Sequence, residues 1–270
     1  MSLRAKVERR TRPAVDKRTG CCTALWGRHA AEDTWVVGTG TSLAGFDFSR
    51  LAGRLTIALN DALLIPGLDP AYGLFHDNGL WVRYYAQSLH PRTHVLCTQA
   101  ARENFYGSER CGFKTRVLWY DHAGQPDDQP AGPGLYVDRT IATGGIHLAW
   151  KLGARRVFLL GVDGYKLREK DGSERYYWTG AEKLYDQKRA GQVVKVREKR
   201  KERMVGGLVV QDRHDAWGEN MRLLKRFFDR GKVFPCKWPG SGVYNLSARS
   251  TIDAWPKITI ESVFQSIDGM

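Results

Sequence analysis

The chain has 270 residues and is 42% hydrophobic, which is enough for one large domain with a packed core or at most two small ones. Its formal net charge of +13 favours an anionic partner, namely nucleic acid, acidic lipid or a charged glycan. No apolar run approaches the length that crosses a bilayer, and none follows the basic N-terminus. We therefore expect no membrane span, no secretory signal and a cytoplasmic location. The five cysteines are scattered, which indicates free thiols and not a zinc site.

The positive charge is concentrated in two segments. Residues 1–18 contain seven basic and two acidic side chains, and residues 181–203 contain nine basic and four acidic ones, so each segment carries +5. The second segment is expected to bind a polyanion through Lys195, Arg197, Lys199, Arg200, Lys201 and Arg203. A solvated helix face and a loose tail explain the same charge without a partner.

In chain order, residues 1–33 are expected to form a basic, weakly ordered arm. Short β-type runs predict strands at Thr34–Gly38, Leu55–Leu59, Ala71–Phe75, Thr93–Cys97, Arg116–Tyr120, Arg156–Gly161 and Lys232–Cys236. Composition predicts a surface loop at 121–134, and apolar spacing predicts helices at Thr143–Leu152 and 214–230. Strands that alternate with helices indicate an α/β fold with a mostly parallel sheet. We expect a single Rossmann-like domain over 34–270, with a basic lid inserted at about 170–210.

Glycines follow the first predicted strand directly, in the run Gly38-Thr39-Gly40-Thr41-Ser42-Leu43. Glycine lets the backbone approach a ligand, and ligands gather at the carboxyl ends of parallel strands. The run therefore predicts a turn whose amides face a phosphate. Glycine turns also follow strands for steric reasons alone, so the run by itself leaves both interpretations open.

Further motifs follow this run in a fixed order along the chain. They are Phe46–Leu51, Ile57–Ala62, Phe75–Asp77, Arg139–Gly145 and Leu159–Tyr165. The ordered set, from about Val36 to about Trp255, resembles the bacterial sialyltransferase-like glycosyltransferases and their phage-encoded relatives, and is similar to archaeal hydroxymethylpterin diphosphokinase-like proteins. The resemblance implies the GT-A-like variant of the Rossmann-like fold and a nucleotide-sugar as co-substrate.

The resemblance also implies a set of residues that bind the donor. These are Gly38, Thr39, Gly40, Thr41, Ser42, Asn60, Asp77, Thr143, Gly144, Gly145 and Asp163, with Arg139 nearby as a catalytic cation. The Thr143–Gly145 turn is expected to open a helix whose N-terminus favours an anion. The chain departs from the family at the glycine turn, where Thr39-Gly40-Thr41-Ser42 replaces Asn-Gly-Pro-Ser.

The departing phosphate has to be stabilised during glycosyl transfer. The sequence has no Asp-x-Asp motif of the kind that holds a divalent metal, so we expect a metal-independent enzyme that uses hydroxyls and cations. The resemblance implies that two tyrosines do this, and Tyr165 matches the first of them. Tyr176 or Tyr177 is the expected second, although plain core packing explains that pair equally well.

The acceptor hydroxyl must lose its proton, and histidine has a suitable pKa for a general base. His214 follows the basic segment and precedes a helix, which is where the resembling enzymes place their catalytic histidine. His76, beside Asp77, is the competing candidate. The sequence places His29, His90, His94 and His122 in loops without a pattern, and His147 inside a helix.

These features predict an inverting glycosyltransferase with an anionic acceptor, and the favoured acceptor is a 5-hydroxymethylpyrimidine in phage DNA, reached by base extrusion. Three alternatives stay open. One is a sialyltransferase acting on a surface glycan or a lipid-linked oligosaccharide, and another is a Mg²⁺-dependent pterin diphosphokinase. The third is a nucleic-acid-binding module without activity. The sequence predicts no oligomeric state.

Overall fold

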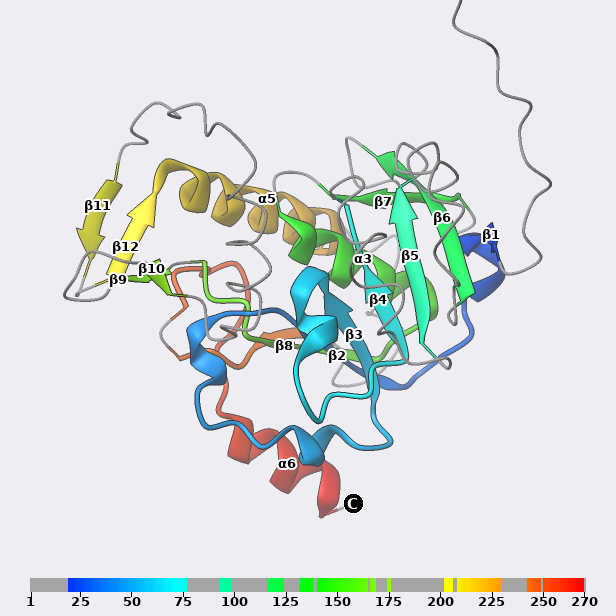
Figure 1. Ribbon diagram of the computed structural model, residues 1–270, viewed down its shortest axis with the longest axis horizontal. Helices are drawn as coiled ribbons and strands as arrows, with labels where there is room; N and C mark the ends of the chain where they lie inside the picture. Colours follow the sequence, from blue (N-terminus) through cyan, green and yellow to red (C-terminus); the bar gives the residue numbers. More distant parts are fainter. Residues whose placement is uncertain are drawn as a thin grey trace, which may run out of the picture.

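The computed structural model describes residues 19–76, 93–98, 116–123, 132–137, 140–164, 166–168, 174–175, 202–205, 208–229, 242–248 and 250–269. A parallel β-sheet forms the centre of this part of the chain (Figure 1). Its strands are β1 (Thr19–Cys21), β2 (Asp33–Val37), β3 (Leu55–Leu59), β4 (Tyr72–Leu74), β5 (His94–Thr98), β6 (Arg116–Ala123), β8 (Arg156–Leu160) and β13 (Gly242–Asn245). They lie in the order β1-β6-β5-β4-β3-β2-β8-β13, and β7 (Gly134–Tyr136) extends the sheet beside the end of β6. The predicted α/β class is thus confirmed.

Both faces of the sheet are covered, so most strands are apolar on both sides. In β2, Val36 points into the core under the helices α3 (Ile141–Leu152) and α5 (Asp212–Asp229), while Trp35 points into the opposite core. There the ring of Trp35 stacks on Phe264 of α6 (Ile260–Asp268), with ring centroids 5.1 Å apart. Figure 1 shows α3 and α5 on one side of the sheet and α6 on the other.

Helix α3 lies very close to the sheet because two of its residues are glycines. It begins at Ile141, and Thr140 caps its N-terminus by accepting a hydrogen bond from the Ala142 amide. A Cβ atom on Gly144 would lie 2.5 Å from Val137 Cγ2, and one on Gly145 would lie 2.8 Å from both Leu59 and Val36. Packing against the sheet therefore accounts for this glycine pair.

We expect Gly144→Ala to destabilise the protein, although alanine favours a helix by about 1 kcal/mol. The added methyl meets the stiff β-branched Val137, and overpacking of this kind costs about 1–3 kcal/mol. Gly218→Ala in α5 is the control, because a Cβ there has no heavy atom within 4 Å. Urea unfolding should show a lower midpoint for Gly144→Ala and an equal or higher one for Gly218→Ala, whereas a rise for both would contradict the close packing.

A second, antiparallel sheet follows the exit of β8. It contains β9 (Lys166–Arg168), β10 (Glu174–Arg175), β11 (Glu202–Val205) and β12 (Leu208–Gln211) in the order β10-β9-β12-β11. Figure 1 shows it at one end of the molecule, beside the start of α5. The basic lid expected at 170–210 falls within this region, but its residues 176–201 lie outside the described residues.

The structure corrects several sequence predictions. Residues 19–33 are not a weakly ordered arm, because β1 pairs with β6, and Cys22 and Leu25 are buried in the core. His94 and His122 lie in strands β5 and β6 and not in loops, and residues 121–123 and 134 of the predicted loop belong to strands. The predicted strand Lys232–Cys236 lies outside the described residues, and the strand that pairs with β8 is β13.

His147 lies inside helix α3, as predicted, and is packed in the core. Its side chain is fully buried and stacks on Trp150 with ring centroids 4.8 Å apart. Nδ1 accepts the Tyr136 amide at 2.8 Å, so the neutral ring carries its proton on Nε2. Burial, and secondarily the charge of Lys151, hold the pKa of His147 well below its ordinary value.

This burial gives the protein a pH-dependent stability. Because the folded-state pKa is depressed, the unfolded chain takes up a proton first as the pH falls. Stability should therefore decrease below about pH 6.5, the ordinary histidine pKa, by up to about 1.4 kcal/mol per pH unit for this one group. Urea unfolding at pH 7.5 and pH 5 measures the loss. We expect His147→Gln to lose less stability between the two pH values, and an unchanged loss in this variant would contradict the assignment.

Candidate functional site

The strand order defines where a ligand is expected to bind. From β2 the chain proceeds through β3, β4, β5 and β6 in one direction along the sheet, whereas β8 and β13 lie on the other side of β2. The direction therefore reverses between β2 and β8, which are parallel neighbours. In open α/β sheets, ligands bind outside the carboxyl ends of the strands at such a switch point.

The glycine turn lies at this point, directly after β2. Its Gly38 and Gly40 amides donate to the carbonyls of Leu160 and Gly161 at 2.8 and 2.9 Å, which holds the turn against the exit of β8. A Cβ on Gly38 would lie 2.5 Å from the Gly161 carbonyl oxygen, and one on Gly40 would lie 2.7 Å from the same atom. Glycine is therefore required at both positions. Within the part of the chain that the structure describes, the amides of Thr39 and Thr41 have no acceptor.

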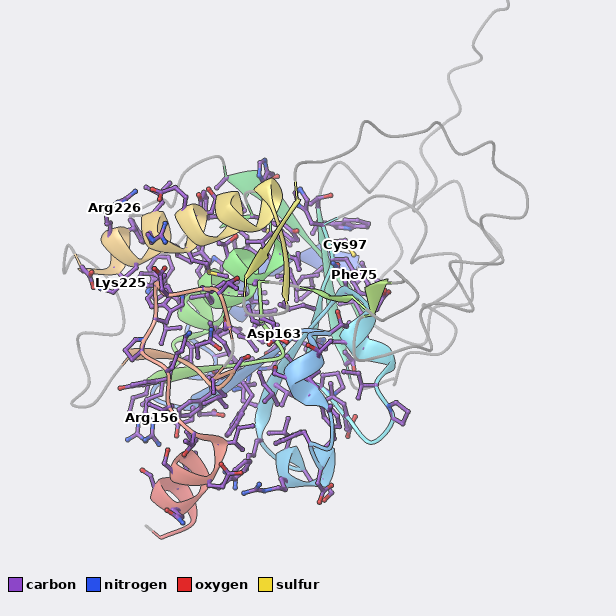
Figure 2. All side chains as sticks on the ribbon, turned by 90° about the vertical axis from the view of Figure 1, so that its left-hand side faces the viewer. Phe75, Cys97, Arg156, Asp163, Lys225 and Arg226 are labelled. Atoms are coloured by element: carbon purple, nitrogen blue, oxygen red, sulfur yellow. The ribbon has the colours of Figure 1, made fainter. Side chains whose placement is uncertain are left out.

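Asp163 links the turn to β8. Its carboxylate is buried and accepts three hydrogen bonds, from the Ser42 amide at 2.8 Å, the Ser42 hydroxyl at 2.5 Å and the Thr41 hydroxyl at 3.4 Å. Figure 2 shows Asp163, which follows β8, near the middle of the molecule and Arg156, the first residue of β8, towards α6. The two ends of β8 therefore present separate polar groups.

The N-terminus of α3 and Asn60 lie at the same edge. Gly144 and Gly145 contact Leu74 and Leu59, the last residues of β4 and β3, so the first turn of α3 lies over the carboxyl ends of these strands. The helix opens at Ile141 and not at the predicted Thr143–Gly145 turn; Thr143 is buried and donates its hydroxyl to the Thr140 carbonyl at 2.7 Å. Asn60, which follows β3, has φ +47°, an uncommon conformation that recurs at functional sites.

The small sheet pairs the segment that follows β8 with the strand that precedes α5. Val209 of β12 lies opposite Lys166 of β9 in an antiparallel pair. Lys166 is three residues after Asp163, and α5 begins at Asp212, three residues after Val209. His214 is the third residue of this helix, which follows β12 directly. Arg203 lies further away, in β11.

His76, the competing candidate for the general base, is paired with His122 farther along the same edge. The rings of His76 and His122 have centroids 5.1 Å apart, and His76 Nδ1 lies 3.4 Å from the Tyr120 hydroxyl. Tyr120 donates to the Phe75 carbonyl, and His122 Nε2 donates to the Val137 carbonyl. A period-two pattern in β6, with Tyr120 and His122 on one face, is the signal that could have brought the two together.

The structure does not describe the other predicted site residues. They are Asp77, Arg139, Tyr165, Tyr176, Tyr177, Lys195, Arg197, Lys199, Arg200 and Lys201.

Exposed basic side chains on α5 are paired with carboxylates. Arg222 donates to both carboxylate oxygens of Asp253, at 2.9 and 3.1 Å, and Glu219 accepts from both Arg222 and Arg226. The hydrogen bond from Arg226, and then that from Arg222, lowers the pKa of Glu219. Lys225 pairs with Asp229. Figure 2 shows Lys225 and Arg226 towards the C-terminal end of this helix. This face of α5 therefore contributes little net positive charge.

Other polar features lie away from the switch point. A cavity of about 110 Å³, lined by Arg156, Tyr244 and Ser262 among others, lies at the amino end of β8. Burial raises the pKa of the Cys22 thiol to about 12. Cys21, Cys22 and Cys97 are free thiols, as predicted for the described cysteines.

Among the described residues, no group of three His, Cys, Asp or Glu side chains is placed to hold a metal ion. No described helix is both long and apolar enough to span a bilayer.

The fold is an open α/β sheet with a glycine turn at its switch point. The structure is similar to the MAf glycosyltransferase from Magnetospirillum magneticum AMB-1, with a TM-score of 0.52 and 18% identity over 87% of this chain and 34% of that chain. The chain thus spans about a third of that protein. This similarity confirms the glycosyltransferase fold that the sequence resemblance implies.

Two structures of the sialyltransferase CstII from Campylobacter jejuni are also similar. The complex with cytidine-5'-monophosphate has a TM-score of 0.45 and 14% identity over 85% of this chain and 86% of that chain. The complex with CMP-3FNeuAc has a TM-score of 0.43 and 14% identity over 84% and 85%. Neither a protein-family model nor a curated protein matches the sequence.

Proposed function

We propose that the protein is a nucleotide-sugar-dependent glycosyltransferase whose donor binds at the carboxyl edge of β2 and β8. The observation that carries this proposal is the turn Gly38–Ser42, which is held rigidly at the topological switch point and leaves the amides of Thr39 and Thr41 for a phosphate. The N-terminus of α3 and Asn60 at the same edge add a favourable dipole and a polar side chain for the nucleotide.

The proposed transfer inverts the anomeric carbon without a metal ion. His214 takes the proton of an acceptor hydroxyl, the oxygen attacks the anomeric carbon, and the bond to the nucleotide phosphate breaks. Arg139, Tyr165 and one of Tyr176 and Tyr177 stabilise the charge on the departing phosphate. The pairing of β12, which leads directly into α5, with β9, which follows the β8 exit, supports the role of His214.

The proposed acceptor is a 5-hydroxymethylpyrimidine in DNA, modified by a phage-type enzyme in the host cytoplasm. The +5 charge of residues 181–203, which include Lys195, Arg197 and Lys199 to Lys201, supports a polyanionic acceptor. The paired charges on α5 make this segment, and not the helix face, the proposed polyanion contact.

A thermal-shift panel tests the donor half of the proposal. CMP, UDP, GDP and their sugars are each added with and without EDTA, and a bound nucleotide raises the melting temperature by mass action. We expect at least one nucleotide to stabilise the protein equally in both conditions. No shift with any nucleotide would contradict the proposal, and a shift that EDTA abolishes would favour the pterin diphosphokinase alternative.

Nucleoside mass spectrometry tests the acceptor half. DNA that contains 5-hydroxymethylcytosine or 5-hydroxymethyluracil is incubated with the protein and the donor that binds. The expected result is a nucleoside heavier by one sugar residue. Unmodified nucleosides with a donor that clearly binds would reject DNA as the acceptor while leaving the transferase assignment in place.

A further inference from the structure

Asp163 is held in place by backbone that only glycine adopts readily. Gly161 and Gly164, on either side of it, have φ of +68° and +72°. A Cβ on Gly161 would lie 2.8 Å from Leu43, and one on Gly164 would lie 2.7 Å from the Thr251 hydroxyl. The exit of β8 is thus a tight bend that turns the Asp163 side chain back towards the glycine turn.

A C-terminal segment secures this bend from the other side. The Thr251 amide and the Ser250 hydroxyl donate to the Asp163 carbonyl at 2.9 and 3.0 Å, and the Thr251 hydroxyl donates to the Gly164 carbonyl at 2.9 Å. Lys257 in turn donates to the Ser250 carbonyl at 2.6 Å. Three segments that are distant in sequence, at 38–42, 161–164 and 250–252, therefore meet at one residue.

The carboxylate of Asp163 is occupied by the turn itself. One oxygen accepts the Ser42 hydroxyl and the other accepts the Ser42 amide, and the residue is only 3% exposed. A carboxylate next to a phosphate is also unfavourable by Coulomb repulsion. Charge and hydrogen bonding both argue against a direct contact with the phosphates of a donor.

We infer that Asp163 is a positioning residue: it latches the Gly38–Ser42 turn in the conformation that binds the nucleotide and does not bind the donor itself. This inference rests on the proposed function for its effect on nucleotide affinity, but the latch is a property of the protein alone. By holding the Ser42 amide inward, the latch determines that the amides of Thr39 and Thr41 are the ones left for a ligand.

Two substitutions at Asp163 separate the latch from a direct contact. Asparagine can still accept the Ser42 amide through its oxygen and donate its NH₂ to the Ser42 hydroxyl, so Asp163→Asn preserves the latch. Asp163→Ala removes it. Asp229→Ala, an exposed carboxylate on α5, is the matched control. For each protein, NMR measures hydrogen exchange at the Ser42 amide, and calorimetry measures the affinity for CMP, UDP and GDP.

We expect Asp163→Ala to speed exchange of the Ser42 amide at least tenfold and to weaken nucleotide binding at least tenfold. In Asp163→Asn both quantities should stay within about threefold of the wild type. An Asn variant that protects the Ser42 amide yet binds as weakly as the Ala variant would make Asp163 a direct ligand and overturn the inference. Unchanged exchange at Ser42 in the Ala variant would also overturn it.

The exchange measurement remains decisive if the wild type binds none of the three nucleotides. The proposed function would then fail, while fast Ser42 exchange in Asp163→Ala would still establish the latch. If Asp163→Ala does not fold, Ser42→Ala replaces it, because this variant removes only the 2.5 Å hydroxyl bond. We expect faster exchange at its position 42 amide than in the wild type, and wild-type exchange there would reject the latch.

Discussion

Replacing Gly40 by alanine is expected to abolish most nucleotide binding and to lower stability. Gly40 has φ −67° and ψ 156°, so alanine fits the backbone, and the whole effect comes from its added methyl group. That Cβ would lie 2.5 Å from the Asp163 carboxylate and 2.7 Å from the Gly161 carbonyl oxygen. The turn must move away from β8 to make room.

The melting temperature and the nucleotide affinity both report the effect of Gly40→Ala. Overpacking costs about 1–3 kcal/mol, which lowers the melting temperature by about 2–4 °C for each kcal/mol in a domain of this size. The displaced turn no longer presents its amides to a phosphate, so we expect the Kd of the best nucleotide to rise at least tenfold, which is about 1.4 kcal/mol.

Gly218→Ala is the matched control for Gly40→Ala, since it adds the same methyl group where no heavy atom lies within 4 Å. It should bind the nucleotide as the wild type does. A Gly40→Ala protein that folds, melts lower and still binds the nucleotide with wild-type affinity would show that the ligand does not use this turn.

His214→Ala is expected to reduce kcat by about 10²–10⁴-fold, the contribution of a positioned general base. Donor affinity should stay within about threefold, because His214 is proposed to act on the acceptor. The pH dependence of kcat should also lose the group that must be deprotonated for the reaction. Single-turnover transfer across pH 5–9 measures both effects.

His76 is the competing base, so His76→Ala is compared in the same assay. The His76 ring lies beside His122 and Tyr120, near the ends of β4 and β6, and farther along the sheet from the β2–β8 switch point. We expect His76→Ala to retain most of the activity. A large loss in His76→Ala together with an active His214→Ala protein would assign the base to His76.

The sequence predicted the central strands because each is a short apolar run that ends at a turn. Leu55–Leu59 is predicted with the observed bounds. The predicted strand Thr34–Gly38 is shifted by one residue from the observed one, and the predicted strand Arg156–Gly161 is one residue too long at its C-terminal end. Strands of three or four residues, such as Thr19–Cys21 and Gly242–Asn245, have too few positions for a pattern, and their pairing with β6 and β8 is decided by the tertiary structure.

At the candidate site, sequence patterns do not indicate which residues contact one another. Glycines at 38, 40, 144 and 145 look alike in the sequence, but the first pair holds the turn against β8, whereas the second lets α3 pack on the sheet. Likewise, nothing in the sequence near Asp163 indicates that its partners are Ser42 and the segment around Thr251. These contacts join residues about 90 to 120 positions apart, and only the fold brings them together.

A crystal structure with the best-binding nucleotide tests most directly whether the edge formed by β2 and β8 binds the nucleotide. We expect a phosphate oxygen within hydrogen-bond distance of the Thr39 or Thr41 amide, with the Ser42 amide still donating to Asp163. A nucleotide bound elsewhere, for example at the Arg156 cavity by the opposite end of β8, would contradict this expectation.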